Sequence, residues 1–89
     1  MNDIVYPIIL TYIDERIFVE IPDFKTEKCA TYGNNVNDTI KKSKELLKKL
    51  TLEHEDIEKK LPKRSNMKEI RKKLKKNQEA IYISLWLPF

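Results

Sequence analysis

The chain has 89 residues, of which 40% are hydrophobic and 36% are charged, and its formal net charge is +4. A folded chain of this length buries only about 60–65% of its unfolded surface, so we expect one domain, residues 1–89, with a single sheet-and-helix core. No segment approaches the ~20 apolar residues that span a bilayer. The single cysteine, Cys29, excludes an internal disulfide and favours a reducing, cytoplasmic location.

Positive charge is concentrated in one stretch of the sequence. In residues 59–76, ten lysine and arginine residues are opposed by a single acid, Glu69. Such a bias is typical of a solvated surface, and also of contact with nucleic acid or an acidic partner. If nucleic acid binds there, we expect contributions from Arg71, Lys72 and Lys73. Binding would be weak, because the stretch has no aromatic residues for base stacking.

A first strand is expected at residues 4–12, which are rich in β-branched side chains and alternate, with largely apolar residues in both sets. Pro7 cannot donate to a strand ladder, so this strand is expected to have a free edge there. Residues 13–16 form a polar turn without glycine. This composition favours a loop of several residues over a tight turn.

A second strand is expected at residues 17–21, and the Pro-Asp pair that follows ends it. Its alternation places Val19 and Ile21 in the core and Glu20 on the outer face. Residues 29–32 indicate a short third strand, in which Cys29 is expected to be a small buried hydrophobe. Gly33, the only glycine, can take a positive φ at no steric cost, which suits a turn into a helix.

A helix is expected over residues 36–53, because apolar side chains at helical spacing form one stripe and lysines fill the opposite face. The stripe consists of Val36, Ile40, Ser43, Leu46, Leu47 and Leu50. Asn34, Asn35 and Asn37 are all possible N-caps, and Asp38 is favourable in the first turn.

The C-terminal third reads as a connector, a short helix and a final strand. Pro62 disfavours helix at the residue before it. Asn66, with an acid three residues later, resembles a capping box that starts a short helix. Residues 80–87 then alternate, with an apolar inner face and with Tyr82 and Trp86 on the outer face. These two aromatic side chains are either covered by the short helix or form a subunit or partner interface.

The expected order is therefore three strands, a helix, a short helix and a returning strand. This pattern is typical of an α+β domain with two layers. Four short motifs lie along it: Tyr6-Pro7-Ile8, the segment 18–24 (FVEIPDF), Thr31-x-Gly33 before the helix, and Leu61-Pro62-x-x-Ser65. In the order and spacing of these motifs, the chain resembles the HicB-like antitoxin family over nearly its whole length.

The resemblance implies a degraded RNase H-like fold with β-β-β-α-β order. It also implies that the chain binds and neutralises HicA, a small mRNA-cleaving toxin, and that it forms a dimer or a higher oligomer. The sequence departs from the family at the first hairpin turn, where Arg16 replaces the usual glycine, and after the Pro-Asp motif, where residues 25–28 replace the usual Pro-Gly pair. The conformation and contacts of that loop are therefore open.

Many relatives also carry a C-terminal DNA-binding domain. We expect none here, because the sequence stops at Phe89, so operator binding does not carry over from the family. The alternative to the antitoxin function is that of a small nucleic-acid-binding regulatory protein that uses residues 59–76.

An RNase H-like fold raises the question of nuclease activity. Two-metal phosphodiester cleavage needs several carboxylates that converge on ions about 3.5–4 Å apart. The available acids are expected at separate places in the fold, so they are not expected to converge. Asp14 and Glu15 are expected in a turn and Glu20 on an outer face. Asp23 is expected after a strand and Asp38 at a helix start. We therefore expect no catalysis, no metal and no cofactor. Asp23 is expected instead to bond backbone N–H groups of its own loop.

The toxin-facing surface is expected to be acidic, because a toxin that binds RNA presents basic residues. Two segments are candidates, the acidic turn after the first strand and the loop after the second. The candidate partner-binding residues are Asp14, Glu15, Asp23, Phe24, Lys25 and Glu27.

Overall fold

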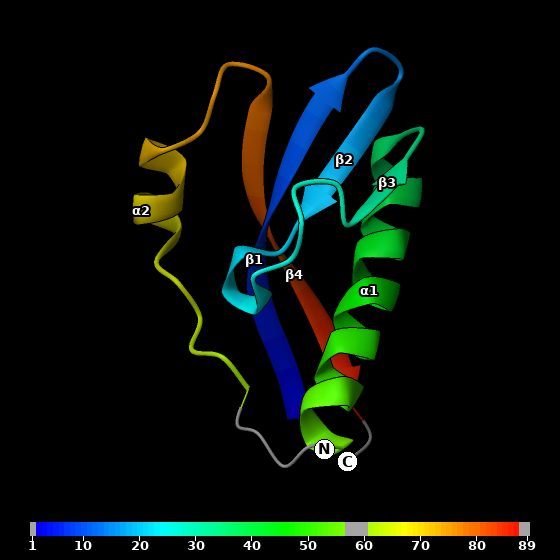
Figure 1. Ribbon diagram of the computed structural model, residues 1–89, viewed down its shortest axis with the longest axis vertical. Coiled ribbons are helices and arrows are strands. Elements are labelled where there is room, and N and C mark those ends of the chain that lie inside the picture. The colour runs from blue at the N-terminus through cyan, green and yellow to red at the C-terminus, as the bar shows by residue number, and fades with distance from the viewer. Residues whose placement is uncertain (1, 57–60, 88–89) are drawn as a thin grey trace.

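The computed structural model describes residues 2–56 and 61–87. Its helices and strands follow in the order expected from the sequence. They are β1 (Asn2–Ile13), β2 (Arg16–Glu20), the 3-10 turn η1 (Pro22–Phe24), β3 (Thr31–Gly33), α1 (Val36–Asp56), α2 (Met67–Lys72) and β4 (Gln78–Leu87). The fold is α+β, with a four-stranded antiparallel sheet and one long helix packed against it (Figure 1).

β1 lies inside the sheet, whose strand order is β3-β2-β1-β4. It pairs with β2 only from Ile9 to Ile13, but with β4 from Asn2 to Thr11. Pro7 therefore lies beyond the end of β2 and pairs with β4 alone, so its missing N–H interrupts no ladder on the β2 side. The free edge expected at Pro7 is confirmed, although β1 as a whole is not an edge strand.

The β1–β2 hairpin has a turn of two residues, so the expectation of a longer loop is wrong. Ile13 pairs with Arg16, and only Asp14 and Glu15 connect the strands. Asp14 has a φ of 55°, in the left-handed region that tight hairpin turns use. Aspartate reaches this conformation more easily than most residues with a side chain, so a tight turn forms here without glycine.

The core lies between one face of the sheet and α1. Alternate residues of β1 and β2 point toward the helix, because side chains alternate across a strand. The buried apolar cluster contains Tyr6, Ile8, Leu10, Ile17, Val19, Ile21, Leu47 and Ile83. The core positions expected for Val19 and Ile21 are confirmed, and Glu20 lies half-buried on the opposite face.

The buried stripe of α1 is more polar than the sequence predicted. Thr39, Ser43 and Thr51 are fully buried, and each hydroxyl donates to the carbonyl oxygen four residues earlier at 2.6–2.7 Å. These bonds satisfy the hydroxyl groups and so reduce the cost of burying them. Val36 is 45% exposed, contrary to its expected place in the stripe, because the stripe that meets the sheet starts one turn later.

Gly33 is required by close packing against the start of α1. Its φ is not positive, so the expectation of a left-handed conformation is wrong. A Cβ at this position would lie 2.3 Å from Oγ1 and 2.7 Å from the backbone nitrogen of Thr39. Just after Gly33, the side-chain oxygen of Asn35 accepts a hydrogen bond from the N–H of Asp38 at 2.8 Å and so caps the helix.

α2 lies beside β4 on the face of the sheet opposite α1 (Figure 1). Asn66 caps it by accepting a hydrogen bond from the N–H of Lys68 at 2.8 Å, as the capping pattern predicted. Met67 is buried, whereas Ile70 and Leu74 are only half-buried. The second face of the sheet is therefore only partly covered, and this incomplete cover shapes the candidate site.

Candidate partner-binding surface

The acidic turn Asp14-Glu15 forms the tip of the β1–β2 hairpin, at one end of the molecule (Figure 1). Both side chains are exposed. Strand pairing up to Ile13 and Arg16 holds the turn from both sides. Two carboxylates on such a fixed support can meet a basic surface with little ordering cost.

Asp23 is engaged within the chain. Its carboxylate accepts a hydrogen bond from the backbone N–H of Ser65 at 2.9 Å and a second one from the Ser65 hydroxyl. The sequence predicted that Asp23 bonds backbone N–H groups of its own loop, but its backbone partner lies 42 residues further along the chain. Asp23 therefore ties the connector before α2 to the end of β2.

Phe24 packs into the interior. Its ring meets the ring of Tyr6 edge to face, with the centroids 4.9 Å apart. The Tyr6 hydroxyl donates a hydrogen bond to the carbonyl oxygen of Pro62. Burial raises the pKa of Tyr6, and the negative charge of Asp23 adds to this effect, while the Arg64 guanidinium opposes it. Phe24 thus belongs to the same anchored region as Asp23.

Lys25 and Glu27 are exposed on the loop between η1 and β3. Lys25 adopts a left-handed conformation with a φ of 54°, and its N–H donates to the carbonyl oxygen of Pro22 at 2.9 Å. The hydroxyl of Thr26 accepts a hydrogen bond from the N–H of Ile21 at 2.9 Å. These bonds order the loop and leave Lys25 and Glu27 facing solvent.

The two candidate segments do not form one compact site. The acidic turn precedes β2 and the Asp23 loop follows it, and β2 has five residues. At about 3.3 Å per residue, the segments are separated by roughly 17 Å. A partner that touches both must therefore lie along the strand.

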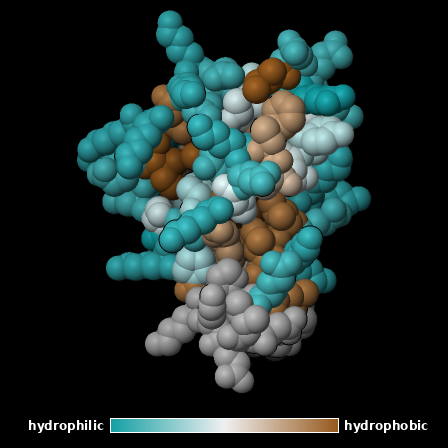
Figure 2. Space-filling model, in the orientation of Figure 1, coloured by the Kyte–Doolittle hydropathy of each residue, from teal (hydrophilic) through white to brown (hydrophobic). Residues whose placement is uncertain are grey.

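Two depressions lie beside these segments. One cavity of about 670 Å³ lies between the sheet and α2, and another of about 580 Å³ lies at the hairpin tip. Ile13 and Phe18 border both of them. We call the larger cavity the second-face groove. Its apolar lining comprises Ile9, Ile13, Phe18, Pro22, Ile70 and Leu74. Figure 2 shows hydrophobic side chains between the charged residues of α2 and the strands.

The basic residues at the C-terminal end of α2 and at its C-cap have different surroundings. Arg71, Lys72 and Lys73 are all exposed, as contact with nucleic acid would require. Lys72 pairs with Glu69 at 3.5 Å, whereas Lys73 lines the second-face groove. Lys59 and Lys60, at the start of the basic stretch, lie outside the described residues.

Tyr82 and Trp86 stand on the outer face of β4, 49% and 58% exposed. The alternative that the short helix covers them is therefore wrong. The guanidinium of Arg64 lies 5.8 Å from the centre of the Tyr82 ring. β4 is an edge strand, so its outer side carries no neighbouring strand within the described chain.

Cys29 is exposed, so the expectation of a buried thiol is wrong: it lies in the loop just before β3, at the margin of the second-face groove. Within residues 2–56 and 61–87, no group of three or more histidine, cysteine, aspartate or glutamate side chains is placed to hold a metal ion. Across the same residues, no helix is both long and apolar enough to cross a membrane.

The fold has a counterpart among solved structures. A chain of a toxin–antitoxin complex from Streptococcus pneumoniae superposes with a TM-score of 0.76, over 93% of this chain and 69% of that chain. The two sequences are 19% identical, so the similarity shows the fold alone. No family model and no curated protein sequence matches the chain significantly.

The second-face groove was not predicted from the sequence. Its signal was the apolar character of both alternating sets in residues 4–12, since a strand with one solvated face has only one apolar set. Phe18, opposite the core positions of β2, was a second sign. The sequence does not show where α2 lies. These two signs therefore could not show whether the second face is covered or open.

Proposed function

We propose that this chain is an HicB-like antitoxin with a degraded RNase H-like fold, and that it binds and neutralises a small HicA-type, mRNA-cleaving toxin. The observation that carries the proposal is the similarity over 93% of the chain to a component of a toxin–antitoxin complex. The order of motifs from Tyr6-Pro7-Ile8 to Leu61-Pro62-x-x-Ser65 supports the same assignment.

In this proposal the chain acts by occlusion and has no catalytic activity. A toxin that cleaves mRNA must attract phosphate, so its working surface is basic. The exposed acids Asp14, Glu15 and Glu27 meet that surface and exclude RNA from it. Asp23 contributes indirectly, because its carboxylate is already bonded to Ser65 and holds the adjacent loop in place.

Co-expression with the products of the reading frames that flank this gene, followed by affinity purification, tests this function. We expect a small basic protein to co-purify. Reversal of three exposed acids, Asp14→Lys, Glu15→Lys and Glu27→Lys, should weaken the complex at least about tenfold, since each close charge pair contributes 1 kcal/mol or more.

The matched control reverses exposed acids on α1, Glu45→Lys and Glu53→Lys, and should leave the affinity unchanged. Equal affinity for both variants would remove the acidic turn and the loop from the interface. Absence of any co-purifying protein would count against the antitoxin function itself.

The antitoxin is proposed to be a homo-oligomer that associates through β4. This strand has ten residues, and its outer side pairs with no other strand among residues 2–56 and 61–87. Glu79 is its only charged residue. Edge strands usually carry charges, bulges or proline that block pairing with another chain. Tyr82 and Trp86 add exposed aromatic area of the kind that anchors interfaces.

A second candidate function is weak nucleic-acid binding by α2. The observation that favours it is the exposure of Arg71, Lys72 and Lys73, which are consecutive at the C-terminal end of α2 and its C-cap. Phosphate contacts would make the affinity fall steeply with salt. Replacement of the three residues by glutamine should abolish a gel shift, and an undiminished shift would exclude this surface.

A further inference from the structure

We propose that the second-face groove binds a small amphiphilic anion, a molecule with an apolar body and a single carboxylate or phosphate head. This binding activity goes beyond the proposed antitoxin function: the groove adjoins the toxin-facing segments, but its lining contains none of the exposed acids Asp14, Glu15 and Glu27. Three properties of the groove support this proposal: its volume, its apolar lining and the excess of lysine residues around it.

The size of the groove fits a small molecule. Its volume of about 670 Å³ lies within the range of about 300–1,000 Å³ that is usual for ligand pockets. The floor is the second face of β1 and β2, with Ile9, Ile13 and Phe18. The opposite wall is formed by Ile70 of α2 and by Leu74, which follows that helix. Of these five side chains, Ile13 is 46% exposed and the others are half-buried, so apolar surface is available to a guest.

The polar amides at the groove are already bonded within the chain. The side-chain amide of Asn77 donates to the carbonyl oxygen of Tyr12 at 3.1 Å. The amide of Gln78 donates to the hydroxyl of Thr11 at 3.0 Å and accepts from the N–H of Lys75 at 2.9 Å. These groups are used for folding, so a neutral polar guest finds few partners among them.

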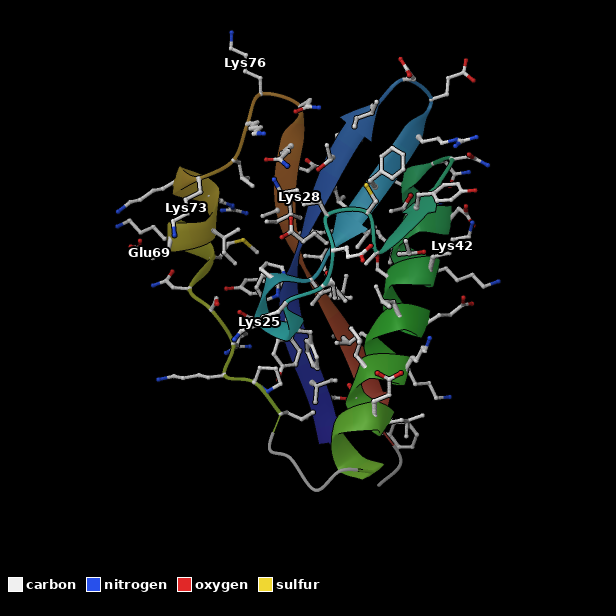
Figure 3. The ribbon with its side chains drawn as sticks, viewed as in Figure 1. Lys25, Lys28, Lys42, Glu69, Lys73 and Lys76 are labelled. Carbon is white, nitrogen blue, oxygen red and sulfur yellow. The ribbon has the colours of Figure 1, made fainter. Side chains whose placement is uncertain are left out.

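The charged groups at the groove are unbalanced toward the positive. Three lysines line it, Lys28 from the loop before β3, and Lys73 and Lys75 from the segment that begins at the C-cap of α2. The lining acids are Glu20 and Glu69, and Glu69 already pairs with Lys72 at 3.5 Å. Figure 3 shows Lys28 and Lys73 on different elements and Lys76 pointing away at the tip of the α2–β4 loop. An anionic head is therefore the charge that complements the mouth.

Calorimetric titration with matched probes below their micelle concentrations tests the proposal. The two anionic amphiphiles, decanoate and decyl phosphate, represent the carboxylate and phosphate sources of the head group. Decyltrimethylammonium has the same chain with the opposite charge, and acetate and inorganic phosphate have the charge without the chain. We expect saturable binding of one or both anionic amphiphiles and none of the other three probes.

Two pairs of variants locate the binding. Ile13→Asp places a charge in the lining and should reduce affinity at least about tenfold. Val36→Asp, at a similarly exposed residue on α1, should have no effect. Lys73→Glu should reduce affinity about three- to fivefold, as expected for an exposed charge pair. Lys76→Glu, outside the lining, should not.

Cys29 supplies a separate readout, because it is an exposed free cysteine among the lining residues of the groove. Saturating decanoate should slow its alkylation by the neutral reagent iodoacetamide. Equal binding of the cationic and anionic amphiphiles would overturn the proposal, as would binding that Ile13→Asp and Lys73→Glu leave unchanged. Absence of binding by every probe, with toxin capture weakened by Ile13→Asp, would make the groove a protein interface and also overturn it.

Discussion

At Gly33 the chain passes so close to α1 that only a hydrogen atom fits. The backbone nitrogen and Cα of Thr39 would lie 2.7 and 2.8 Å from an added Cβ. Backbone atoms cannot move aside as a flexible side chain can. Gly33→Ala should therefore destabilise the fold by about 1–3 kcal/mol, the usual cost of overpacking. Urea denaturation measures this, and an unchanged midpoint would show that the helix start yields without strain.

The Asp23–Ser65 contact is the residue-scale link between the connector and the sheet. Two hydrogen bonds join the carboxylate to Ser65 in a half-buried setting. Asp23→Ala and Ser65→Ala should each lower stability, and a double-mutant cycle should give a coupling free energy of about 1 kcal/mol. Additive effects in the cycle would mean that the contact does not stabilise the fold.

Tyr12 gives the molecule a pH-dependent contact. Its hydroxyl donates to the carboxylate of Glu79, and this bond, with burial and the negative charge of Glu79, raises the pKa of Tyr12 from 10.0 to about 12. The folded chain keeps this proton to a higher pH than the unfolded chain. The stabilisation is therefore complete below pH 10 and is lost as the pH rises toward 12.

The difference in absorbance at 295 nm between the wild type and Tyr12→Phe isolates this group. We expect the difference to titrate with a midpoint near 12. A midpoint near 10, the ordinary value of a tyrosine, would show that the hydrogen bond to Glu79 is not formed in solution.

At the scale of the elements, periodicity predicted the strands and the main helix because burial on one face leaves a repeating pattern in the sequence. The order of elements, the core placement of Val19 and Ile21 and the cap at Asn66 were predicted correctly. Tertiary geometry determined the rest. The tight turn at Asp14 and the close approach at Gly33 depend on contacts that no local pattern encodes.

The candidate site was predictable only in part for the same reason. Charge and loop position marked Asp14, Glu15 and Glu27 as exposed, and they are. The sequence could not show that Asp23 is engaged by Ser65, because the two residues are 42 positions apart. The second-face groove depends on where α2 lies. The sequence of the connector before α2 does not determine that position.

The free side of β4 leads to a prediction about association. If two copies pair through this strand, Trp86→Lys and Tyr82→Lys place like charges at the new interface and should convert a dimer into a monomer. Analytical ultracentrifugation measures the change. The control, Tyr32→Lys on β3, alters a similarly exposed aromatic residue at the other end of the sheet. A monomeric wild type, or a dimer that survives both substitutions, would exclude this interface.

For the molecule as a whole, the two faces of the sheet are covered to different extents. α1 covers one face, where the buried cluster around Ile8, Leu10 and Leu47 lies. The other face is only partly covered by α2 and carries the groove, with the acidic turn beyond one end. The fold therefore keeps its main apolar cluster on one face and leaves part of the opposite face accessible.

The most direct test of the antitoxin function is growth of cells that express the product of the adjacent small open reading frame, with and without this chain. We expect that product alone to arrest growth and to degrade mRNA, and co-expression of the wild-type chain to restore both. The variant with Asp14→Lys, Glu15→Lys and Glu27→Lys should restore growth less well than the variant with Glu45→Lys and Glu53→Lys. A harmless neighbour, or growth arrest that the wild-type chain does not relieve, would contradict the proposed function.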